Sequence, residues 1–254
     1  MTSPFQFLNN YFDKILVLTL PRLTNRIEYI KNTFEGLNYE FFYGVDKQLT
    51  SLEELKSRGL YTTDAYRKFY KKPAEIPLGM LCCSLGHINI YNHIIENKFS
   101  KTLILEDDAV PVMKELEKFP EIIKELPDDW ELFYLGYEKH EHAGMKGTLN
   151  RLFLTLFPHH AQLKLNRRVF KNYYAVPVSP LIAKAGFHDC THAYAVTLDG
   201  ACKLKEHSLP VSSHPDNLLA YLNCSGILAG YISRTKLFNQ MSAFVNEIDS
   251  LTST

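Results

Sequence analysis

Short, nearly continuous hydrophobic runs alternate along this 254-residue chain with longer segments whose hydrophobic residues recur at helical spacing. The run from Asp13 to Leu20 is mostly aliphatic, which predicts a strand buried on both faces, as in a parallel sheet. Helical spacing follows from Thr24 to Gly36, where Ile27, Ile30 and Phe34 fall on one face. The same criteria predict strands over 39–45, 102–105, 130–135 and 191–198, a last strand region over 226–238, and helices over 78–97, 115–126, 200–207 and 217–222.

The order of these segments predicts the fold class. A strand, a helix and a strand in succession form a βαβ unit, so we expect an α/β fold with a mostly parallel, twisted sheet flanked by helices. Ligands of such sheets bind beyond the carboxyl ends of the strands. The loop over 21–26 and the acidic triplet over 106–108 both follow strands, so we expect both at that end. Residues 52–72 are polar and mixed, which predicts short helices or a mobile segment.

The segment over 137–186 differs from its surroundings. It holds four histidines at spacings that suit no standard metal site, several basic residues, and a hydrophobic stretch around Phe153. We expect a single domain over 1–254 in which residues 137–186 form a variable insertion. This insertion is either a lid or acceptor-binding region, or a structural element without a direct role. The sequence leaves open a mild attraction to an anionic lipid surface.

Composition narrows the classes of protein to consider. With 46% hydrophobic and 22% charged residues the chain is ordinary for a globular protein. Its 28 basic and 28 acidic residues create no net field that would attract nucleic acid. We expect neither a signal peptide in residues 1–10 nor a transmembrane helix, which requires about 18 apolar residues. The five cysteines match neither a disulfide framework nor zinc spacing, so we expect the protein to reside in the reducing cytoplasm. Any membrane contact would be peripheral, at the inner face of the membrane.

The acidic triplet is the first candidate for chemistry. Leu103 to Leu105 predicts a buried strand that runs directly into Glu106, Asp107 and Asp108. Adjacent carboxylates repel one another unless a cation neutralises them. Oxygen ligands suit Mn²⁺ or Mg²⁺, which often link protein carboxylates to phosphates. The alternative interpretation is a solvated acidic turn at the end of a strand.

Four other polar residues have both a functional and a structural interpretation. Arg22 and Arg26 follow the first strand beside a predicted helix N-terminus, where they either bind a phosphate or contribute ordinary surface charge. His87 lies on a predicted helix, where a hydrogen-bonded core role is the more common one. Asp216 lies at or beside a helix N-terminus, so a capping role competes with a catalytic one.

A series of blocks in the chain resembles glycosyltransferase family 25, which comprises lipooligosaccharide and collagen galactosyltransferases. The similar blocks are Ile15 to Arg26, Tyr39 to Asp46, Gly79 to His87, Leu103 to Asp108, Thr191 to Ala201, Pro215 to Leu219, and the closing segment Leu237 to Ser250 around Gln240. They cover most of the chain outside the middle insertion. Each motif is moderately specific, and the resemblance rests on their order and spacing together.

The resemblance implies a GT-A-like fold and a metal-dependent transfer that inverts the sugar's anomeric centre. The expected reaction moves a hexose from a UDP-sugar donor to a hydroxyl of a saccharide or glycolipid acceptor. Galactose is the first candidate for this hexose. Asp108, with Glu106 or Asp107, would hold Mn²⁺ or Mg²⁺, and Asp216 would be the general base. The residues expected to bind the donor are Leu20, Pro21, Arg22, Arg26, Asp46, His87, Glu106, Asp107 and Gln240.

The chain departs from the family pattern at several positions. Asn25 stands in place of an Asp, Cys82 in place of a Gly and Gly86 in place of a Ser. Many members have a His just before the closing Gln, where this chain has Phe-Asn. If that His completes the metal site, then Asn239, His188 or a substrate phosphate would have to replace it.

These departures keep a second function open. A sugar- or nucleotide-binding protein that retained the fold and lost catalysis would tolerate all of them. A metal-dependent phosphate hydrolase is a weaker alternative. It would need a nucleophilic Asp directly after the strand, and Glu106 occupies that place.

Overall fold

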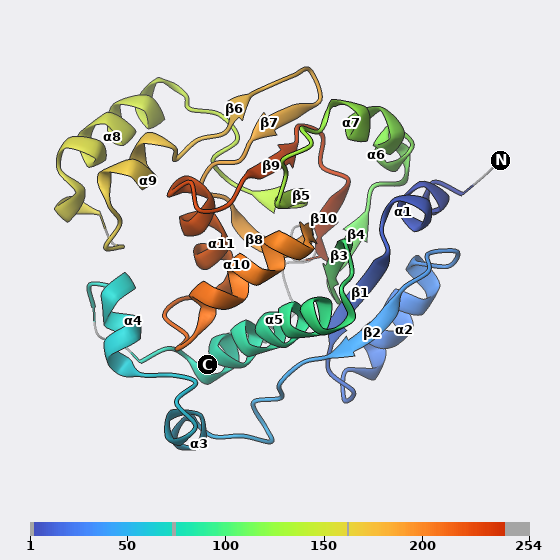
Figure 1. The fold of residues 1–254 in the computed structure, drawn as a ribbon, viewed down its shortest axis with the longest axis horizontal. Helices are drawn as coiled ribbons and strands as arrows, with labels where there is room; N and C mark the ends of the chain where they lie inside the picture. Colours follow the sequence, from blue (N-terminus) through green and yellow to red (C-terminus); the bar gives the residue numbers. More distant parts are fainter. Residues whose placement is uncertain (1–2, 73–74, 162, 242–254) are drawn as a thin grey trace.

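The structure is a computed structural model that describes residues 3–72, 75–161 and 163–241. A sheet of eight strands, in the order β2-β1-β3-β8-β5-β9-β7-β6, forms its centre, and β10 pairs with β4 in a second, small sheet (Figure 1). The strands are β1 (Lys14–Thr19), β2 (Glu40–Tyr43), β3 (Lys101–Glu106), β4 (Ala109–Pro111), β5 (Leu132–Glu138), β6 (Val176–Pro177), β7 (Ile182–Lys184), β8 (Asp189–Thr197), β9 (Gly230–Ser233) and β10 (Phe238–Gln240). The helices are α1 (Phe5–Tyr11), α2 (Thr24–Thr33), α3 (Leu52–Ser57), α4 (Thr63–Phe69), α5 (Leu78–Asn97), α6 (Met113–Leu116), α7 (Phe119–Glu125), α8 (Met145–Leu156), the 3₁₀ helix η1 (Pro158–His160), α9 (Arg167–Lys171), α10 (Leu198–Ser208) and α11 (Pro215–Cys224).

Most strands of the large sheet share one direction. β1 is parallel to β2 and β3, and β5 is parallel to β9. β8 lies between β3 and β5 and is antiparallel to both, while β7 is antiparallel to β9 and β6. The predicted α/β class, a largely parallel sheet flanked by helices, is confirmed. The sheet is nevertheless mixed, and the reversal of β8 and β7 was not predicted.

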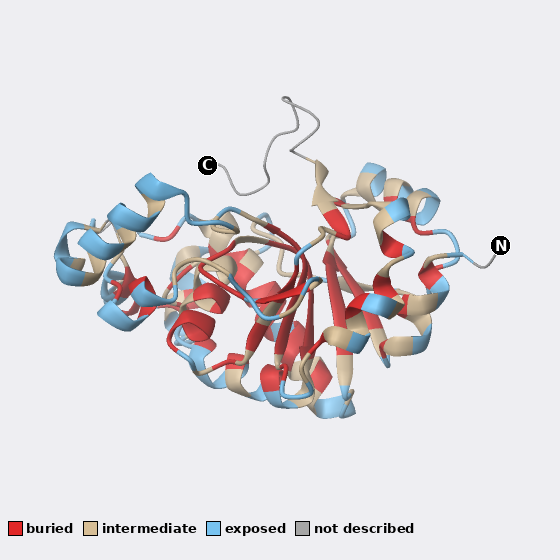
Figure 2. Cartoon of the chain, turned by 90° about the horizontal axis from the view of Figure 1, so that it is seen from above, coloured by how far each residue is buried: buried red, intermediate tan, exposed pale blue. Residues whose placement is uncertain are grey.

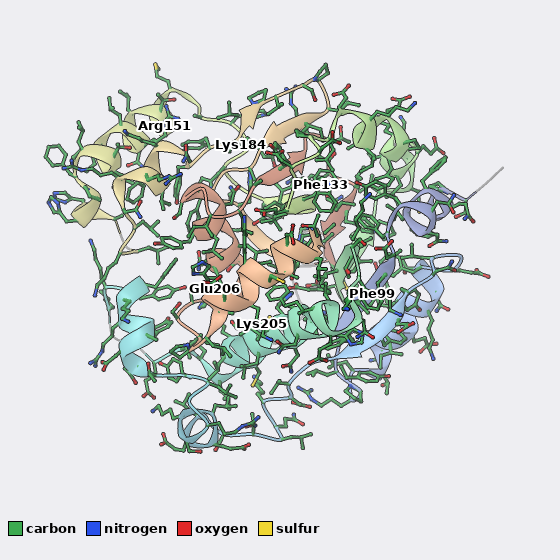
Figure 3. The ribbon with its side chains drawn as sticks, in the orientation of Figure 1. Phe99, Phe133, Arg151, Lys184, Lys205 and Glu206 are labelled. Carbon is green, nitrogen blue, oxygen red and sulfur yellow. The ribbon has the colours of Figure 1, made fainter. Side chains whose placement is uncertain are left out.

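Alternate residues of the central strands point to opposite faces of the sheet, and each face carries its own hydrophobic core. Val17, Leu105 and Phe133 pack on one face with residues of α1, α2 and α7. Leu16 and Tyr194 pack on the other face with residues of α5, α10 and α11. Figure 2 shows the strands buried at the centre and the outer sides of the helices exposed, and Figure 3 labels Phe133. This alternation explains why the β1 and β3 segments are hydrophobic at nearly every position.

Helix α5 lies close against the ends of the first two strands because a glycine faces them. A Cβ at Gly86 would lie 3.3 Å from the Leu18 side chain and 3.7 Å from the Gly44 Cα. Both are tight or ordinary contact distances, so a larger side chain would push the helix away. The N-terminal half of α5 therefore forms a wall beside the carboxyl ends of β1 and β3.

Several elements differ from the sequence predictions. The helix expected over 115–126 is divided into α6 and α7, because Pro120 stands in the first turn of α7, where proline is tolerated. The strand region expected over 226–238 is β9, a turn and then β10, which belong to different sheets. Helix α11 begins at Pro215, earlier than the expected residue 217.

Two further expectations concern the middle segment and the tail of the chain. Residues 137–186 contain the end of β5 and then α8, η1, α9, β6 and β7, so this segment has its own regular structure and contributes two edge strands. The part of the closing segment over 242–250, and the rest of the polar tail to residue 254, lie outside the described residues. Among the described residues, none of the helices is both long enough and apolar enough to span a membrane.

Candidate active site

Three consecutive carboxylates at the end of β3 reach three different environments. Glu106 is the last residue of the strand, and Asp107 and Asp108 form the turn into β4. Successive side chains of an extended chain point to opposite faces, and the turn redirects the third. The triplet is therefore not a uniform acidic patch, and each of its members has its own neighbours.

Glu106 faces α5 and β8. Its Oε1 accepts a hydrogen bond from Thr191 Oγ1 at 2.6 Å and lies 3.1 Å from His87 Nε2. The Nδ1 of His87 lies 2.8 Å from the Tyr194 hydroxyl, which fixes the ring. Burial alone would raise the pKa of Glu106, but the hydrogen bond and charge of His87 outweigh it and hold that pKa below its usual range. Glu106 is thus a half-buried anion.

Asp107 turns the opposite way, toward β1 and α2. Its Oδ2 accepts a hydrogen bond from Thr19 Oγ1 at 2.7 Å, and its Oδ1 accepts one from Arg26 Nη1 at 2.5 Å. Burial raises the pKa of Asp107 above its usual range despite the guanidinium beside it. Because protein donors occupy both oxygens, Asp107 is better placed to hold Arg26 than to bind a cation.

Asp108 has the most perturbed carboxyl group of the three. Burial, and then repulsion by Glu106, raises the pKa of Asp108 to about 7. Its Oδ2 accepts a hydrogen bond from Gln240 Nε2 at 3.0 Å and lies 4.0 Å from Arg26 Nη1. Its Oδ1 is buried and has no hydrogen-bond partner among the described residues.

The residues present fit a divalent cation. A buried, unpartnered carboxylate oxygen beside a second anion is unfavourable, and a cation bound by Asp108 and Glu106 would remove both penalties. Such oxygen ligands suit Mn²⁺ or Mg²⁺. Ligand atoms of Cys83, His87 and Glu106 also lie within 4.8 Å of one another. Burial, however, raises the pKa of Cys83 well above its usual range, which disfavours the thiolate that a metal would need.

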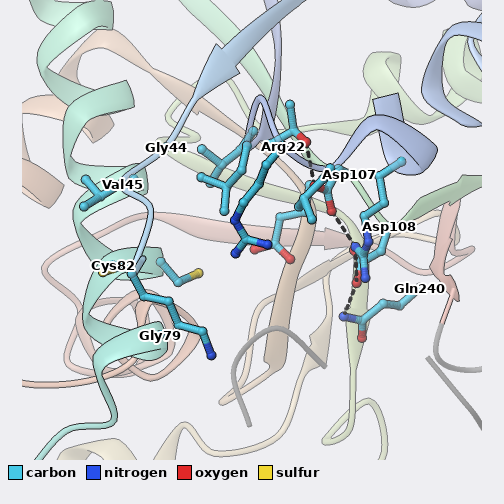
Figure 4. A pocket seen from close by; sticks show the side chains of 17 residues that line it. Arg22, Gly44, Val45, Gly79, Cys82, Asp107, Asp108 and Gln240 are labelled. Carbon is cyan, nitrogen blue, oxygen red and sulfur yellow. Dashed lines mark hydrogen bonds and ion pairs between the residues drawn. The ribbon is translucent and has the colours of Figure 1, made fainter. Parts of the chain in front are cut away.

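A cavity of about 200 Å³ opens beside the triplet, between the ends of β1 and β3 and the start of α5 (Figure 4). Its walls include the two arginines of the loop after β1, each held by a carboxylate: Arg26 by Asp107, and Arg22 Nε by Asp46 Oδ2 at 2.6 Å. The lining residues are Leu18, Thr19, Leu20, Arg22, Leu23, Arg26, Gly44, Val45, Lys47, Gly79, Cys82, Cys83, Gly86, Glu106, Asp107, Asp108 and Gln240. A small cavity with cationic groups and an unsatisfied anionic group can receive an anionic ligand through a bridging cation.

Most of the residues expected to bind the donor lie at this cavity, and three do not line it. Asp46 contacts it through Arg22, and His87 contacts it through Glu106. Pro21 is exposed and does not belong to the lining. All other expected donor-binding residues, namely Leu20, Arg22, Arg26, Glu106, Asp107 and Gln240, are part of the wall.

Asp216 lies outside this cavity, in the first turn of α11. Its Oδ1 accepts a hydrogen bond from the Asn217 backbone N–H at 2.7 Å, and its Oδ2 accepts a longer one from the Cys190 backbone N–H at 3.4 Å. His214, not Asp216, is the N-cap residue of α11. Burial raises the pKa of Asp216, and the nearby His214 only partly opposes this. A carboxylate with a raised pKa is better suited to accept a proton than an ordinary one.

Cys190 connects Asp216 to the triplet. Its backbone N–H contacts Asp216, and its Sγ donates to Gln240 Oε1 at 3.4 Å, while Gln240 donates to Asp108. The backbone of Cys190 has a φ of 71°, a conformation that is uncommon for residues with a side chain and recurs at functional sites. Asp108 and Asp216 thus lie at the two ends of one short chain of contacts.

The structure reduces the choice of groups that could replace the absent histidine. His188 is fully buried, with Nδ1 2.7 Å from the Lys139 carbonyl oxygen and Nε2 accepting from the Gly186 N–H at 3.0 Å. Burial also lowers the pKa of His188 to about 4. Since both ring nitrogens are engaged, His188 is excluded as a metal ligand in this conformation. Asn239 lies in β10 beside Gln240 and remains a candidate, as does a substrate phosphate.

Sequence reasoning missed several residues of the site. Thr19 and Thr191 bind the triplet from the ends of β1 and β8, and Cys190 links it to Asp216. His192 is fully buried, interacts electrostatically with Glu106, and has an unpartnered Nδ1 among the described residues. The available signal was a group of polar residues at the start of the otherwise apolar 191–198 segment, but nothing in that pattern specifies which face they occupy.

Comparison with known proteins adds an independent line of evidence. The family model described as "Glycosyltransferase family 25 (LPS biosynthesis protein)" matches residues 12–219. Procollagen galactosyltransferase 2 of Mus musculus is 25% identical over 198 residues, which are 76% of this chain and 27% of the relative. A glycosyltransferase 25 family member of Drosophila melanogaster is 32% identical over 98 residues, 38% of this chain and 16% of the relative. The chain therefore spans about a quarter or less of the length of these relatives.

Proposed function

Because the chain belongs to glycosyltransferase family 25, we propose that it transfers a hexose, with galactose the first candidate, from a UDP-sugar to a hydroxyl of a saccharide or glycoconjugate. The names of the procollagen galactosyltransferase relatives support galactose. The observation that carries the proposal is the buried Oδ1 of Asp108, which has no partner among the described residues and lies beside Glu106, at the edge of a cavity that two arginines line. UDP is an anionic leaving group, and such a site concentrates the groups needed to stabilise it.

The donor side of the reaction is assigned to the cavity. Asp108 and Glu106 would hold Mn²⁺ or Mg²⁺, which when bound would neutralise charge on the departing diphosphate. Arg22 and Arg26 would add charge-assisted hydrogen bonds to it. Asp107 fixes the guanidinium of Arg26 before the donor arrives, so less entropy is lost when it binds.

The acceptor side of the reaction is assigned to Asp216. Inversion at the anomeric carbon requires one base, on the face opposite the leaving group, to take the proton of the attacking hydroxyl. Asp216 lies outside the donor cavity and is connected to it through Cys190 and Gln240, which supports its assignment to the acceptor side. Its raised pKa, caused by burial, improves its strength as a proton acceptor.

The mixed α/β sheet flanked by helices is the basis for proposing a GT-A-like domain. All five cysteines are free, which supports the proposed reducing cytoplasmic setting. We keep one alternative function, a sugar- or nucleotide-binding protein with impaired catalysis. The observation that favours it is the engagement of both nitrogens of His188, which leaves the absent closing histidine without that replacement.

Release of UDP tests the proposal and the alternative together. UDP-galactose, UDP-glucose and N-acetylated donors are offered with saccharide acceptors, in Mn²⁺, in Mg²⁺ and in EDTA. We expect UDP release that depends on the acceptor and on the cation, and that is fastest with UDP-galactose. The matched control is Asp199→Asn, which changes an exposed carboxylate on α10 and should leave the rate unchanged. Tight UDP binding without turnover for any donor would favour the binding protein, and absence of UDP binding would reject both the transferase and a nucleotide-binding protein.

A further inference from the structure

Helix α8 presents a row of large hydrophobic side chains to solvent. Its exposed residues are Met145 (83% exposed), Leu149 (63%), Leu152 (57%), Phe153 (45%) and Leu156 (55%). Their spacing of three and four residues places them on one side of the helix, and we call them the α8 surface. None of the residues of α8 is buried, and Figures 1 and 2 show the helix at the outer edge of the molecule.

The opposite side of α8 is fixed to the domain. Leu154 packs against a small core formed by Val169 and Phe170 of α9 together with neighbouring residues. A Cβ at Gly147 would lie 2.5 Å from the Tyr174 hydroxyl, so the helix approaches the domain closely at this glycine. Gly147 and Leu154 are seven residues apart and therefore share a helix face. Packing of this face against the domain therefore fixes the orientation of α8 and directs its hydrophobic row outward.

The segment that carries α8 is strongly basic although the whole chain has no net charge. Residues 142–188 contain no Asp or Glu, and their seven basic residues are Lys146, Arg151, Lys164, Arg167, Arg168, Lys171 and Lys184. Six of the seven are exposed and Arg151 is half-buried, and Figure 3 shows Arg151 on α8 in the same upper part of the view as Lys184. Within the part of the chain that the structure describes, no ion pair involves any of them.

A second basic group adjoins this segment. Residues 67–72, at the end of α4, include Arg67, Lys68, Lys71 and Lys72, all exposed. Lys71 Nζ donates to the His159 carbonyl oxygen, and Lys164 Nζ donates to the Arg67 carbonyl oxygen at 2.6 Å. These contacts join the two groups at one end of the molecule, where positive charge is concentrated.

We propose that the α8 surface binds an anionic lipid membrane, with the helix lying in the plane of the interface. A hydrophobic row flanked by basic side chains is the arrangement by which interfacial helices insert their apolar face among acyl chains while their cations meet lipid phosphates. A second copy of this chain is a poorer occupant. A symmetric contact would bring the same basic segment, with seven positive charges, against itself. The proposal does not depend on the proposed transfer reaction.

Vesicle sedimentation of the full chain tests this inference. We compare vesicles of phosphatidylcholine alone with vesicles in which a third of the lipid is phosphatidylglycerol, at low and at high salt. We expect binding to the anionic vesicles, weakened by salt because the basic residues act through screened charge. The variant Leu152→Gln should weaken binding by about tenfold, because a leucine that becomes largely buried among acyl chains contributes somewhat more than 1 kcal/mol to binding.

Matched variants separate the two contributions. Lys146→Gln with Lys171→Gln should weaken binding to anionic vesicles by roughly fivefold per lysine. Lys124→Gln with Lys205→Gln removes the same charge from exposed positions on α7 and α10 and should have little effect. All these side chains are exposed, and circular dichroism and the unfolding midpoint should confirm that the variants fold.

Leu49→Gln is the control for Leu152→Gln, because Leu49 is 85% exposed in the loop before α3. It should bind vesicles as the wild type does. Equal affinity for the two kinds of vesicle, absence of binding, or equal loss in Leu49→Gln and Leu152→Gln would each overturn the proposal. So would self-association in the absence of lipid that Leu152→Gln abolishes, because a second copy would then be the occupant of the α8 surface.

Discussion

Replacing Asp108 by asparagine should stabilise the cation-free protein at neutral and alkaline pH, even though it removes a side chain proposed to be essential. Among the residues that the structure describes, the buried Oδ1 of Asp108 has no hydrogen-bond partner, and Glu106 repels the charge of this carboxylate. Asparagine has nearly the same shape and carries no charge, and its side-chain oxygen can still accept the hydrogen bond from Gln240. The substitution therefore removes an electrostatic penalty and leaves the packing nearly unchanged.

The magnitude follows from the pKa of Asp108. That pKa is about 7 in the folded protein, against an ordinary value of 3.8, and a difference of about three units corresponds to roughly 4 kcal/mol. Between these values the folded state binds more protons than the unfolded state, so stability falls as the pH rises from about 4 to about 7. The side chain is only 16% exposed, so solvent screening reduces this value only in part. The stabilisation by Asp108→Asn should be close to zero near pH 4 and reach a few kcal/mol at pH 8.

Urea unfolding at pH 5 and pH 8, in EDTA, measures this difference. Asp46→Asn is the matched control, because the pKa of Asp46 is shifted in the opposite direction from that of Asp108. Burial opposes it, but hydrogen bonds from Arg22 and the Gln48 backbone hold the pKa of Asp46 below its usual range. Its charge contributes stability at any pH above its unfolded-state pKa. Asp46→Asn should therefore lower the free energy of unfolding at both pH values.

Addition of Mn²⁺ provides the second half of the test. A cation that binds the folded state alone stabilises it according to its concentration and affinity. Mn²⁺ should stabilise the wild type more at pH 8 than at pH 5, because protonated Asp108 is a poor ligand, and should stabilise Asp108→Asn little. The reasoning is refuted if the variant is no more stable than the wild type at pH 8, or if Mn²⁺ stabilises both proteins equally.

Three further predictions test other parts of the structure. Arg26→Ala should weaken UDP binding at least tenfold in calorimetry, because a charge-assisted contact is worth about 1.5–3 kcal/mol, and unchanged affinity would remove Arg26 from the site. Asp216→Asn should lower turnover by roughly two to four orders of magnitude while UDP affinity and thermal stability are kept; a retained rate would refute its role as a base. Gly200→Ala should destabilise the fold by about 1–3 kcal/mol, because its Cβ would lie 2.2 Å from the Glu131 carbonyl oxygen. Gly144→Ala, with open space at that position, should be nearly neutral in the same unfolding experiment, and equal effects would contradict this packing argument.

Periodicity and residue type were sufficient to predict the elements that carry the donor side of the site. The segments that form β1 and β3 are continuous hydrophobic runs because both faces of these strands are covered by helices. Helix α5 was predicted over its observed bounds, Leu78–Asn97, because its buried positions recur at helical spacing over twenty residues. Long hydrophobic patterns of this kind result directly from burial, so they predict the observed elements correctly.

The reversed strands and the pairing of β10 with β4 could not be predicted in the same way. Strand direction is set by the path of the connection, and the connection from β5 to β8 contains the whole middle segment. β4 and β10 have three residues each, too few for a period to be seen, yet their pairing brings Gln240 to Asp108 across 132 positions. The exclusion of His188 likewise depends on backbone groups that no side-chain pattern reveals.

The acidic triplet shows why sequence could locate the site but not divide its roles. As a string of letters, Glu106, Asp107 and Asp108 differ by at most one methylene group, and any of them could bind a cation. The strand pleat directs Glu106 to His87 and Asp107 to the opposite side, and the turn directs Asp108 toward β10. Within the described structure, one carboxylate is thereby held as an anion, one is engaged by protein donors, and one is left with an unpartnered oxygen and a pKa of about 7. Charge repulsion among neighbours in sequence is common to all three, so it is the register of β3 that decides which of them needs a cation.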